Sequence, residues 1–461
     1  MDTQEKSMLN KLFKLKENNT SVKTEMMAGL TSFMTMAYIL AVNPSVLSTT
    51  GMDPTAVLLA TCLASFVGCL CMAFLANTPF LLSAGMGVNA YFAYTVVQQM
   101  GVPWQVALFA VFVEGILFII LSLTRVREAI FNSIPLSLKN GVSVGIGVYI
   151  AFIGLQSAGL TVPSDDTLVT IVNFTENFQT SGICALLAVI GTLLMAFLYI
   201  KKVKGSILIG ILATWLLGML CQVTGLHQPD PALGYSSLYP SFAFTDFSKL
   251  GTTFGQCFNL DFSGVNILDF IVVLFAFLFV DLFNTLGSVI GVSAKAGMLD
   301  KEGKLPQIRP VLLSDAIATT AGAIFGTSTT TTFIESSTGI AAGGRTGLTA
   351  LVGGILFLLA TLFAPIFTAI PSFATAPALL VVGFLMFGNI VHLNFDENNY
   401  TETIPAYLCI IAMPLFYSIT EGISIGIISY AFLNLVCGKG KKVSPVVYVL
   451  AVLFILKYIF L

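Results

Sequence analysis

Four polar residues lie in the otherwise apolar segment "FVDLFNTLGS" (279–288), namely Asp281, Asn284, Thr285 and Ser288. Their positions are i, i+3, i+4 and i+7, so on an α-helix the four side chains lie on one face. A carboxylate facing lipid at the bilayer centre costs about 3 kcal/mol or more, so Asp281 must face protein, water or a ligand. The spacing predicts a polar stripe that lines a binding site. A carboxylate that only bonds neighbouring hydroxyls is the alternative.

Three further acids lie within apolar runs. Glu335 follows a run of threonines, near the start of a predicted half-helix, which aims its carboxylate at a break in the span. Asp315, in "LLSDAIATTAG", fits a coupling role and a structural role equally well. Glu114, in "FVEGILF", fits a structural role better.

Residue content excludes several kinds of chemistry. The chain has two histidines, and both lie outside the predicted spans, which excludes a Ser-His-Asp triad or a histidine metal site in the membrane. The Walker A motif G-x-x-x-x-G-K-[ST], which binds the phosphates of ATP, is absent, so the sequence disfavours an ATP-driven pump. The cysteines sit mostly in apolar runs without zinc-ligand spacing, and we expect no metal and no cofactor. Secondary transport remains, with carboxylates as the groups that can carry a proton inside the membrane.

Composition indicates a polytopic membrane protein. The 461 residues are 56% hydrophobic and 10% charged, whereas a soluble domain carries about 25% charged residues. The formal net charge of −2 gives no basic field for nucleic acid, so we expect no nucleic-acid partner. The lipid bilayer is the expected environment.

Apolar runs predict about fourteen spans. These are 27–48, 54–77, 79–99, 103–124, 140–159, 181–200, 204–222, 266–293, 311–327, 330–345, 348–370, 375–391, 402–419 and 422–438, with 443–461 as a further apolar helix. Nearly all Lys and Arg residues near span ends fall on one side, which predicts that both termini are cytoplasmic and that loops 160–180 and 223–265 face outward. Seven spans on each side of loop 223–265 predict an inverted repeat.

The third span of each half has an unusual sequence. Glycines interrupt the apolar run in each segment, and neither run is long enough to form one continuous membrane-spanning helix. The segments are "NTPFLLSAGMGVNAYFAY" (77–94) and "FGTSTTTTFIESSTGIAAGGRTG" (325–347). Such sequences favour a short extended stretch followed by a half-helix, and paired interrupted spans indicate a transporter's binding site. A glycine-rich helix that packs closely is the alternative.

Four segments closely resemble the adenine/guanine/hypoxanthine permeases, the azaguanine-sensitive branch of the nucleobase:cation symporters related to the xanthine/uracil permeases. They are "GMGVNAYF" (85–92), "DLFNTLGS" (281–288), "SDAIATTAGAIFGTSTTTTFIESSTGIAAGGRTGLTA" (314–350) and "TEGISIGIISY" (420–430). The resemblance implies an all-α polytopic fold of fourteen transmembrane spans in two inverted seven-span repeats, uracil-permease-like, with short antiparallel strands in spans three and ten. It implies a core and a moving gate, and proton symport of purine bases across the plasma membrane.

The implied organisation has seven parts. They are a cytoplasmic N-terminal segment (1–26), core spans 1–4 (27–124), gate spans 5–7 (140–222), an extracytoplasmic loop (223–265), core spans 8–11 (266–370), gate spans 12–14 (375–438) and a C-terminal apolar helix (443–461).

The resemblance also implies roles for individual residues. Glu335 matches the tenth-span acid that contacts the base, Asp315 matches a ninth-span acid needed for activity, and Asn89 lies in the third-span motif. The eighth-span motif of this branch usually reads D-x-F-D-T-x-G-T, so Asn284 stands where the family has a second acid. An amide cannot take up a proton, although it can hydrogen-bond a purine edge. Either coupling rests on Glu335, Asp281 or Asp315, or Asn284 is an introduced change that weakens coupling.

The sequence thus predicts a proton-coupled importer of purine bases that works by alternating access. Hypoxanthine and guanine are favoured, and adenine is the third candidate. The expected substrate-binding residues are Asn284, Glu335, Asp281, Thr285, Asn89, Ile334, Phe333, Thr332 and Phe33, and the expected proton-coupling residues are Glu335, Asp315 and Asp281. The gate spans are candidates for a homodimer contact. The rival interpretations are a carrier of xanthine, uracil or a small anion on the same fold, and an uncoupled channel; a membrane enzyme is disfavoured because no nucleophile–base pair or metal set is present.

Overall fold

The computed structural model describes residues 9–124, 134–229, 237–240, 243–262, 265–296, 298 and 305–460. The helices are α2 (Val22–Met36), α3 (Ile39–Leu47), α4 (Pro54–Cys71), α5 (Met86–Ala90), α6 (Trp104–Leu123), α8 (Leu136–Ser157), α9 (Ile183–Ile200), α10 (Ser206–Val223), α11 (Ile267–Ala296), α12 (Ile308–Phe325), α13 (Ser336–Ala341), α14 (Gly347–Ala360), α15 (Ala364–Thr368), α16 (Ser372–Phe387), α17 (Tyr400–Leu415), α18 (Ile419–Val436) and α19 (Pro445–Phe460). The strands are β1 (Leu82–Ala84), β2 (Thr161–Ser164), β3 (Leu168–Ile171) and β4 (Thr330–Thr332).

Ten helical segments within these ranges are long and apolar enough to cross a membrane. They carry large apolar side chains on their outer surfaces as well as in their packed cores, as for Leu193 on α9 and Phe384 on α16, which are 66% and 65% exposed. Helices that are apolar on both faces are typical of membrane spans. The chain is therefore a mostly helical, multi-pass membrane protein.

Side-chain caps fix the start of several helices. The Asp53 carboxylate accepts hydrogen bonds from the backbone N–H groups of Thr55 and Ala56 at 2.9 and 3.0 Å, and Pro54 occupies the first position of α4. Ser21 and Ser418 accept in the same way at the starts of α2 and α18. These acceptors satisfy N–H groups that have no partner within the helix.

The two interrupted segments, 77–94 and 325–347, meet as a pair of short antiparallel strands. β1 pairs with β4 in the register Leu82–Thr332, Ser83–Thr331 and Ala84–Thr330. The half-helices α5 and α13 follow the two strands directly. This confirms the extended stretches and half-helices predicted from the glycine and threonine runs. Pairing matters here because unpaired N–H and C=O groups at membrane depth cost several kcal/mol each.

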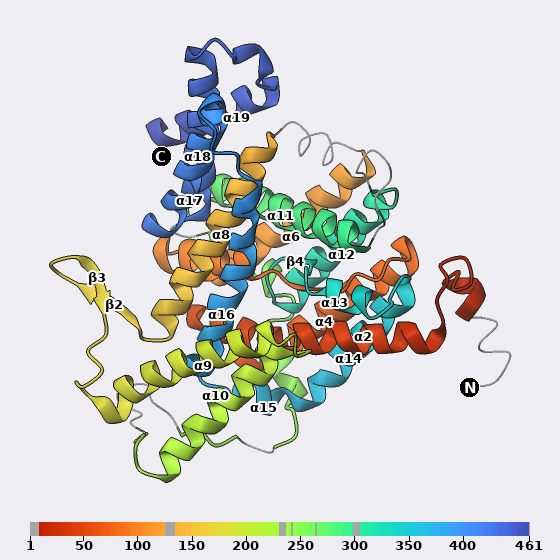
Figure 1. Ribbon diagram of the computed structural model, residues 1–461, viewed down its shortest axis with the longest axis vertical. Coiled ribbons are helices and arrows are strands. Elements are labelled where there is room, and N and C mark those ends of the chain that lie inside the picture. The colour runs from red at the N-terminus through yellow and green to blue at the C-terminus, as the bar shows by residue number, and fades with distance from the viewer. Residues whose placement is uncertain are drawn as a thin grey trace.

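The long helices form two packed groups (Figure 1). In one group, α4 and α14 pack against each other, α6 and α4 pack on α12, and α2 lies along α14. In the other group α8 lies against α16 and α17, while α17 pairs with α18 and α9 with α10. The β1–β4 pair contacts α4 and α12 of the first group, and it also contacts α11. The interrupted spans therefore lie inside a framework of continuous helices.

Two regions differ from the expected pattern. The first predicted span, 27–48, is not one continuous helix, because it is interrupted at Ala37 and Tyr38 between α2 and α3. Here the N–H groups of Leu40 and Ala41 donate to the carbonyls of Ala37 and Tyr38, three residues back, beside the four-residue bond from Val42 to Tyr38, and these three-residue bonds tighten the turn. The predicted loop 160–180 contains the hairpin of β2 and β3.

Candidate functional site

The polar stripe of α11 faces β4, the strand of the interrupted segment 325–347. The Asn284 side-chain amide, half-buried, donates to the Thr331 hydroxyl at 3.4 Å. Gly85 lies against the same two side chains, and a Cβ there would be 2.9 Å from the Thr331 hydroxyl oxygen and 3.1 Å from the Asn284 nitrogen. Only a glycine therefore leaves room where β1 ends, β4 runs and α11 passes.

Glu335 lies at the N-terminus of α13 and is half-buried. Its Oε1 accepts a hydrogen bond from the Tyr38 hydroxyl at 3.0 Å. The Tyr38 ring lies 6.4 Å from the ring of Phe333, the residue that follows β4 and extends the strand pairing through its N–H to Leu81. The break in the first span therefore brings an aromatic hydroxyl to the predicted substrate-contacting acid.

A buried cluster joins Asp281, Thr285 and Asp315 behind the strand. The Thr285 hydroxyl is 2.9 Å from an Asp281 oxygen and 3.2 and 3.3 Å from the two Asp315 oxygens. All three residues have no exposed surface. Asp315 also accepts the backbone N–H of Thr332 at 3.2 Å. One hydroxyl proton can serve one acceptor at a time, so this arrangement places two carboxylates within reach of a single donor.

Asn89 belongs to a second buried network, at the other end of the strand pair. Its amide donates to the Asn43 side-chain oxygen, and its own oxygen accepts from the Ser328 hydroxyl. Asn43 in turn donates to Thr61 at 2.7 Å and to Thr327 at 3.1 Å. This network ties α3, α4 and α5 to the segment before β4. Asn89 thus supports the strands through their neighbours.

The remaining predicted residues take varied positions. The Thr331 side chain lies beside Asn284, and strand alternation turns the Thr332 side chain to the other face. The Thr332 backbone N–H donates to Asp315. Ile334 is half-buried against the apolar cluster that includes Val289 and Ile340. The Phe33 ring packs edge-on against Phe357 at 5.1 Å. The structure therefore gathers Asn284, Glu335 and Phe333 around the strands, whereas Phe33 of α2 packs against Phe357 of α14.

Three residues of the site were missed from the sequence, namely Tyr38, Asn43 and Thr331. These residues are neutral and lie outside the polar stripe of 281–288, so they stand out less than the acids in the apolar runs. Tyr38 and Asn43 lie five residues apart in "YILAVN", inside an apolar span, and every buried polar side chain in a span needs a partner. A search for all hydrogen-bonding side chains would have found them.

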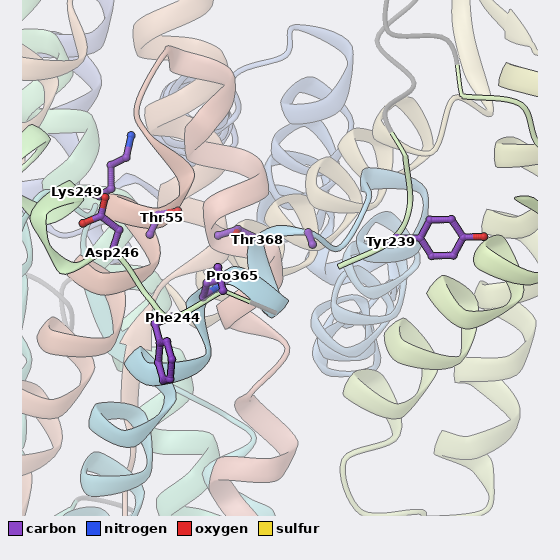
Figure 2. Close-up of a pocket in the computed structure, with 9 residues that line it drawn as sticks. Thr55, Tyr239, Phe244, Asp246, Lys249, Pro365 and Thr368 are labelled. Atoms are coloured by element: carbon purple, nitrogen blue, oxygen red, sulfur yellow. The ribbon is translucent and has the colours of Figure 1, made fainter. Parts of the chain in front are cut away.

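An open pocket with a volume of about 380 Å³ lies elsewhere, between the loop residues 239 and 243–249 and the helices α4 and α15. Figure 2 shows Asp246 and Lys249 on one side of it and Tyr239 on a separate loop segment. Hydrogen bonds from the Ser248 hydroxyl and N–H hold the pKa of the exposed Asp246 below its usual value. None of the predicted substrate residues lines this pocket.

Among the described residues, no three His, Cys, Asp or Glu side chains group as metal ligands.

The xanthine/uracil permease model, described as "Permease family", matches residues 23–452. The chain belongs to this family. The match confirms the resemblance seen in the four sequence motifs, and it makes the chain a transporter and not an enzyme.

Individual relatives align over nearly the full length. A guanine/hypoxanthine permease of Bacillus subtilis, PbuO, is 42% identical, with 97% of this chain and 99% of the relative covered. An adenine permease of Escherichia coli, AdeP, is 39% identical, with 100% and 98% covered. Among solved structures, the transmembrane domain of a cyanobacterial bicarbonate transporter, BicA, matches with a TM-score of 0.61 at 13% identity, covering 88% of this chain and 97% of that chain. That identity supports a shared fold only.

Proposed function

We propose that this protein is a proton-coupled importer of purine bases. The observation that carries the proposal is the pairing of β1 with β4 between Asn284 and Glu335, in a permease whose full-length relatives are named as adenine and guanine/hypoxanthine permeases. A flat base fits beside strand backbone, with its polar edge toward an amide and a carboxylate. The ring of Phe333 supplies an apolar face beside the same strand.

Recognition of the base would follow from donors and acceptors. A Glu335 carboxylate can accept from the N1–H and 2-amino groups of guanine, or from the N1–H of hypoxanthine alone. Adenine lacks the N1 proton and needs a donor, which the Asn284 amide or a protonated Glu335 provides. Because a carboxylate accepts from these N–H donors, the site favours guanine and hypoxanthine as substrates.

Proton coupling would rest on the acids around the strand. Glu335 lies at the substrate edge, and Asp281 and Asp315 reach the same hydroxyl of Thr285 directly behind β4. Two ionised carboxylates at one donor repel each other, and uptake of one proton relieves this repulsion. Because Asp315 also holds the Thr332 N–H, protonation there would change the position of the strand that holds the base.

We further propose fourteen spans in two inverted repeats. In support, α11 and α17 occupy the predicted eighth and thirteenth spans, and interrupted spans with strand and half-helix occur at corresponding places in both halves. The helices around the strands would form the core, and the group with α8 and α16 would form the gate that moves during alternating access and offers a homodimer surface. The lopsided Lys and Arg distribution supports cytoplasmic termini, in the plasma membrane.

An anion carrier is the main rival. An anion site would use a cation or a bare half-helix N-terminus. Here Glu335 occupies the N-terminus of α13, and Arg345 lies beyond the opposite end, where its guanidinium bonds the carbonyls of Ile340 and Gly344. This placement disfavours an anion and favours a neutral base with N–H donors.

The test is uptake of labelled hypoxanthine by cells that express the protein, in competition with adenine, guanine, xanthine and uracil, with and without a protonophore. Saturable, pH-dependent uptake inhibited by purines is the expected result. Non-saturable flux would indicate a channel, and inhibition by xanthine or uracil alone would indicate another substrate class.

A further inference from the structure

Glu114 lies fully buried on α6 and is absent from the site described so far. Its Oε2 accepts a hydrogen bond from the Thr329 hydroxyl at 2.9 Å. Thr329 comes directly before β4 and is also fully buried. A buried carboxyl that makes no hydrogen bond destabilises the folded state. The bond to Glu114 therefore favours the observed position of Thr329.

Close packing of α6 on α12 brings this carboxyl to the strand. Gly115 lies against Thr320 of α12, and a Cβ at Gly115 would be 2.3 Å from the Thr320 hydroxyl oxygen and 2.8 Å from its backbone nitrogen. A larger residue would push the two helices apart. The neighbouring Glu114 is thereby held close enough to reach past α12 to Thr329.

Thr329 connects both interrupted spans. Its carbonyl accepts the N–H of Gly85 at 2.9 Å, at the point where β1 ends and α5 begins. At the other end of β4, the Thr332 N–H donates to Asp315 at 3.2 Å. Two buried carboxyls on two neighbouring helices, α6 and α12, therefore hold the two ends of the four-residue segment from Thr329 to Thr332.

We infer that Glu114 is a positioning residue for the substrate site, which fixes strand β4 and, through Thr329 and Gly85, the start of α5. This inference rests on the proposed function, because the positioned strand is the one that carries Thr331 beside Asn284. The role needs only an acceptor oxygen at Glu114. A proton carrier at the same place would need a titrating group, and the two roles therefore separate on substitution by glutamine.

The experiment compares five single variants and one double variant by initial rates of hypoxanthine uptake, each normalised to the amount of protein in the membrane. Glu114→Leu removes the acceptor and Thr329→Val removes the donor. Glu114→Gln keeps an acceptor oxygen and Thr329→Ser keeps the hydroxyl. Ser122→Ala is the matched control, since Ser122 is a buried residue of α6 whose hydroxyl makes no hydrogen bond to the described residues.

Glu114→Leu and Thr329→Val should each raise KM by roughly tenfold or more while Vmax per transporter changes by less than about threefold, because the site is displaced and not removed. Glu114→Gln and Thr329→Ser should keep KM within about threefold of the parent, with proton-driven accumulation retained. The double variant Glu114→Leu/Thr329→Val should be little worse than the poorer single variant, because both changes break one bond.

Unchanged KM in Glu114→Leu and Thr329→Val would overturn the inference. Loss of accumulation in Glu114→Gln with normal KM would also overturn it and assign Glu114 to proton transfer. If Glu114→Leu does not reach the membrane, the KM values of Thr329→Val and Thr329→Ser are enough to test the positioning role. A parent protein that takes up no purine would refute the proposed function instead, which keeps the two failures distinct.

Discussion

The Tyr38 hydroxyl donates to Glu335 at 3.0 Å, and this bond joins the break in the first span to the N-terminus of α13. The two residues are 297 positions apart in the sequence. Tyr38 is fully buried and has its ring near Phe333, so the bond orients the carboxylate at the edge of the strand pair. A rigid donor of this kind sets the direction in which Glu335 presents its second oxygen.

Tyr38→Phe should therefore weaken substrate binding. Hydrogen bonds to charged groups contribute about 1.5–3 kcal/mol, so we expect KM for hypoxanthine to rise roughly tenfold or more with little change in the amount of protein in the membrane. Tyr407→Phe is the control, because Tyr407 is 52% exposed on α17. Equal KM values in both variants would show that Tyr38 does not orient Glu335.

Asn284→Asp introduces the acid that the resemblance to the purine permeases implies at this position. The new carboxylate would lie beside Thr331, where the Asn284 amide now donates at 3.4 Å. Because an acid at this position can take up a proton, we expect greater proton-dependent accumulation of substrate. Accumulation ratios measured at several external pH values provide the test. Identical ratios and pH dependence would show that Glu335, Asp281 or Asp315 already suffices.

Glu25 links α2 to the start of α14 through hydrogen bonds. Its carboxylate accepts the N–H groups of Arg345 and Thr346 at 2.9 and 3.2 Å and the Thr349 hydroxyl at 2.6 Å. Glu25→Ala leaves these buried donors without that acceptor, so the free energy of unfolding should fall by about 2–4 kcal/mol. Thermal unfolding in detergent should show a lower Tm than for Glu17→Gln, a change at an exposed residue. A Tm equal to that of the control would contradict the assigned role.

Orientation in the membrane can be tested by cysteine labelling. Ser237 is exposed in the loop after α10, and Cys437 is exposed directly after α18. With both termini cytoplasmic, a membrane-impermeant maleimide should label Ser237→Cys on intact cells, whereas native Cys437 should react only after permeabilisation. The reverse pattern would invert the topology.

Local signals in the sequence predicted the two extended stretches and the polar face of the 281–288 helix, and the resemblance implied that the stretches are antiparallel strands. Glycine at 85 and the threonines of 329–332 disfavour a continuous helix, and the spacing from Asp281 to Ser288 defines one helix face. The register of β1 on β4 and the bonds of Tyr38 and Glu114 could not be predicted in this way. They join residues more than two hundred positions apart, and a single sequence carries no signal for such contacts.

We propose that a proton gradient drives purine uptake through Glu335. The most direct test is accumulation of labelled hypoxanthine in proteoliposomes that contain the purified protein, with an acidic exterior. We predict accumulation above the external concentration that collapses with a protonophore, and a Glu335→Gln protein that still exchanges bound base across the membrane without concentrating it. Accumulation that survives the protonophore, or that Glu335→Gln supports in full with unaltered affinity, would contradict this account.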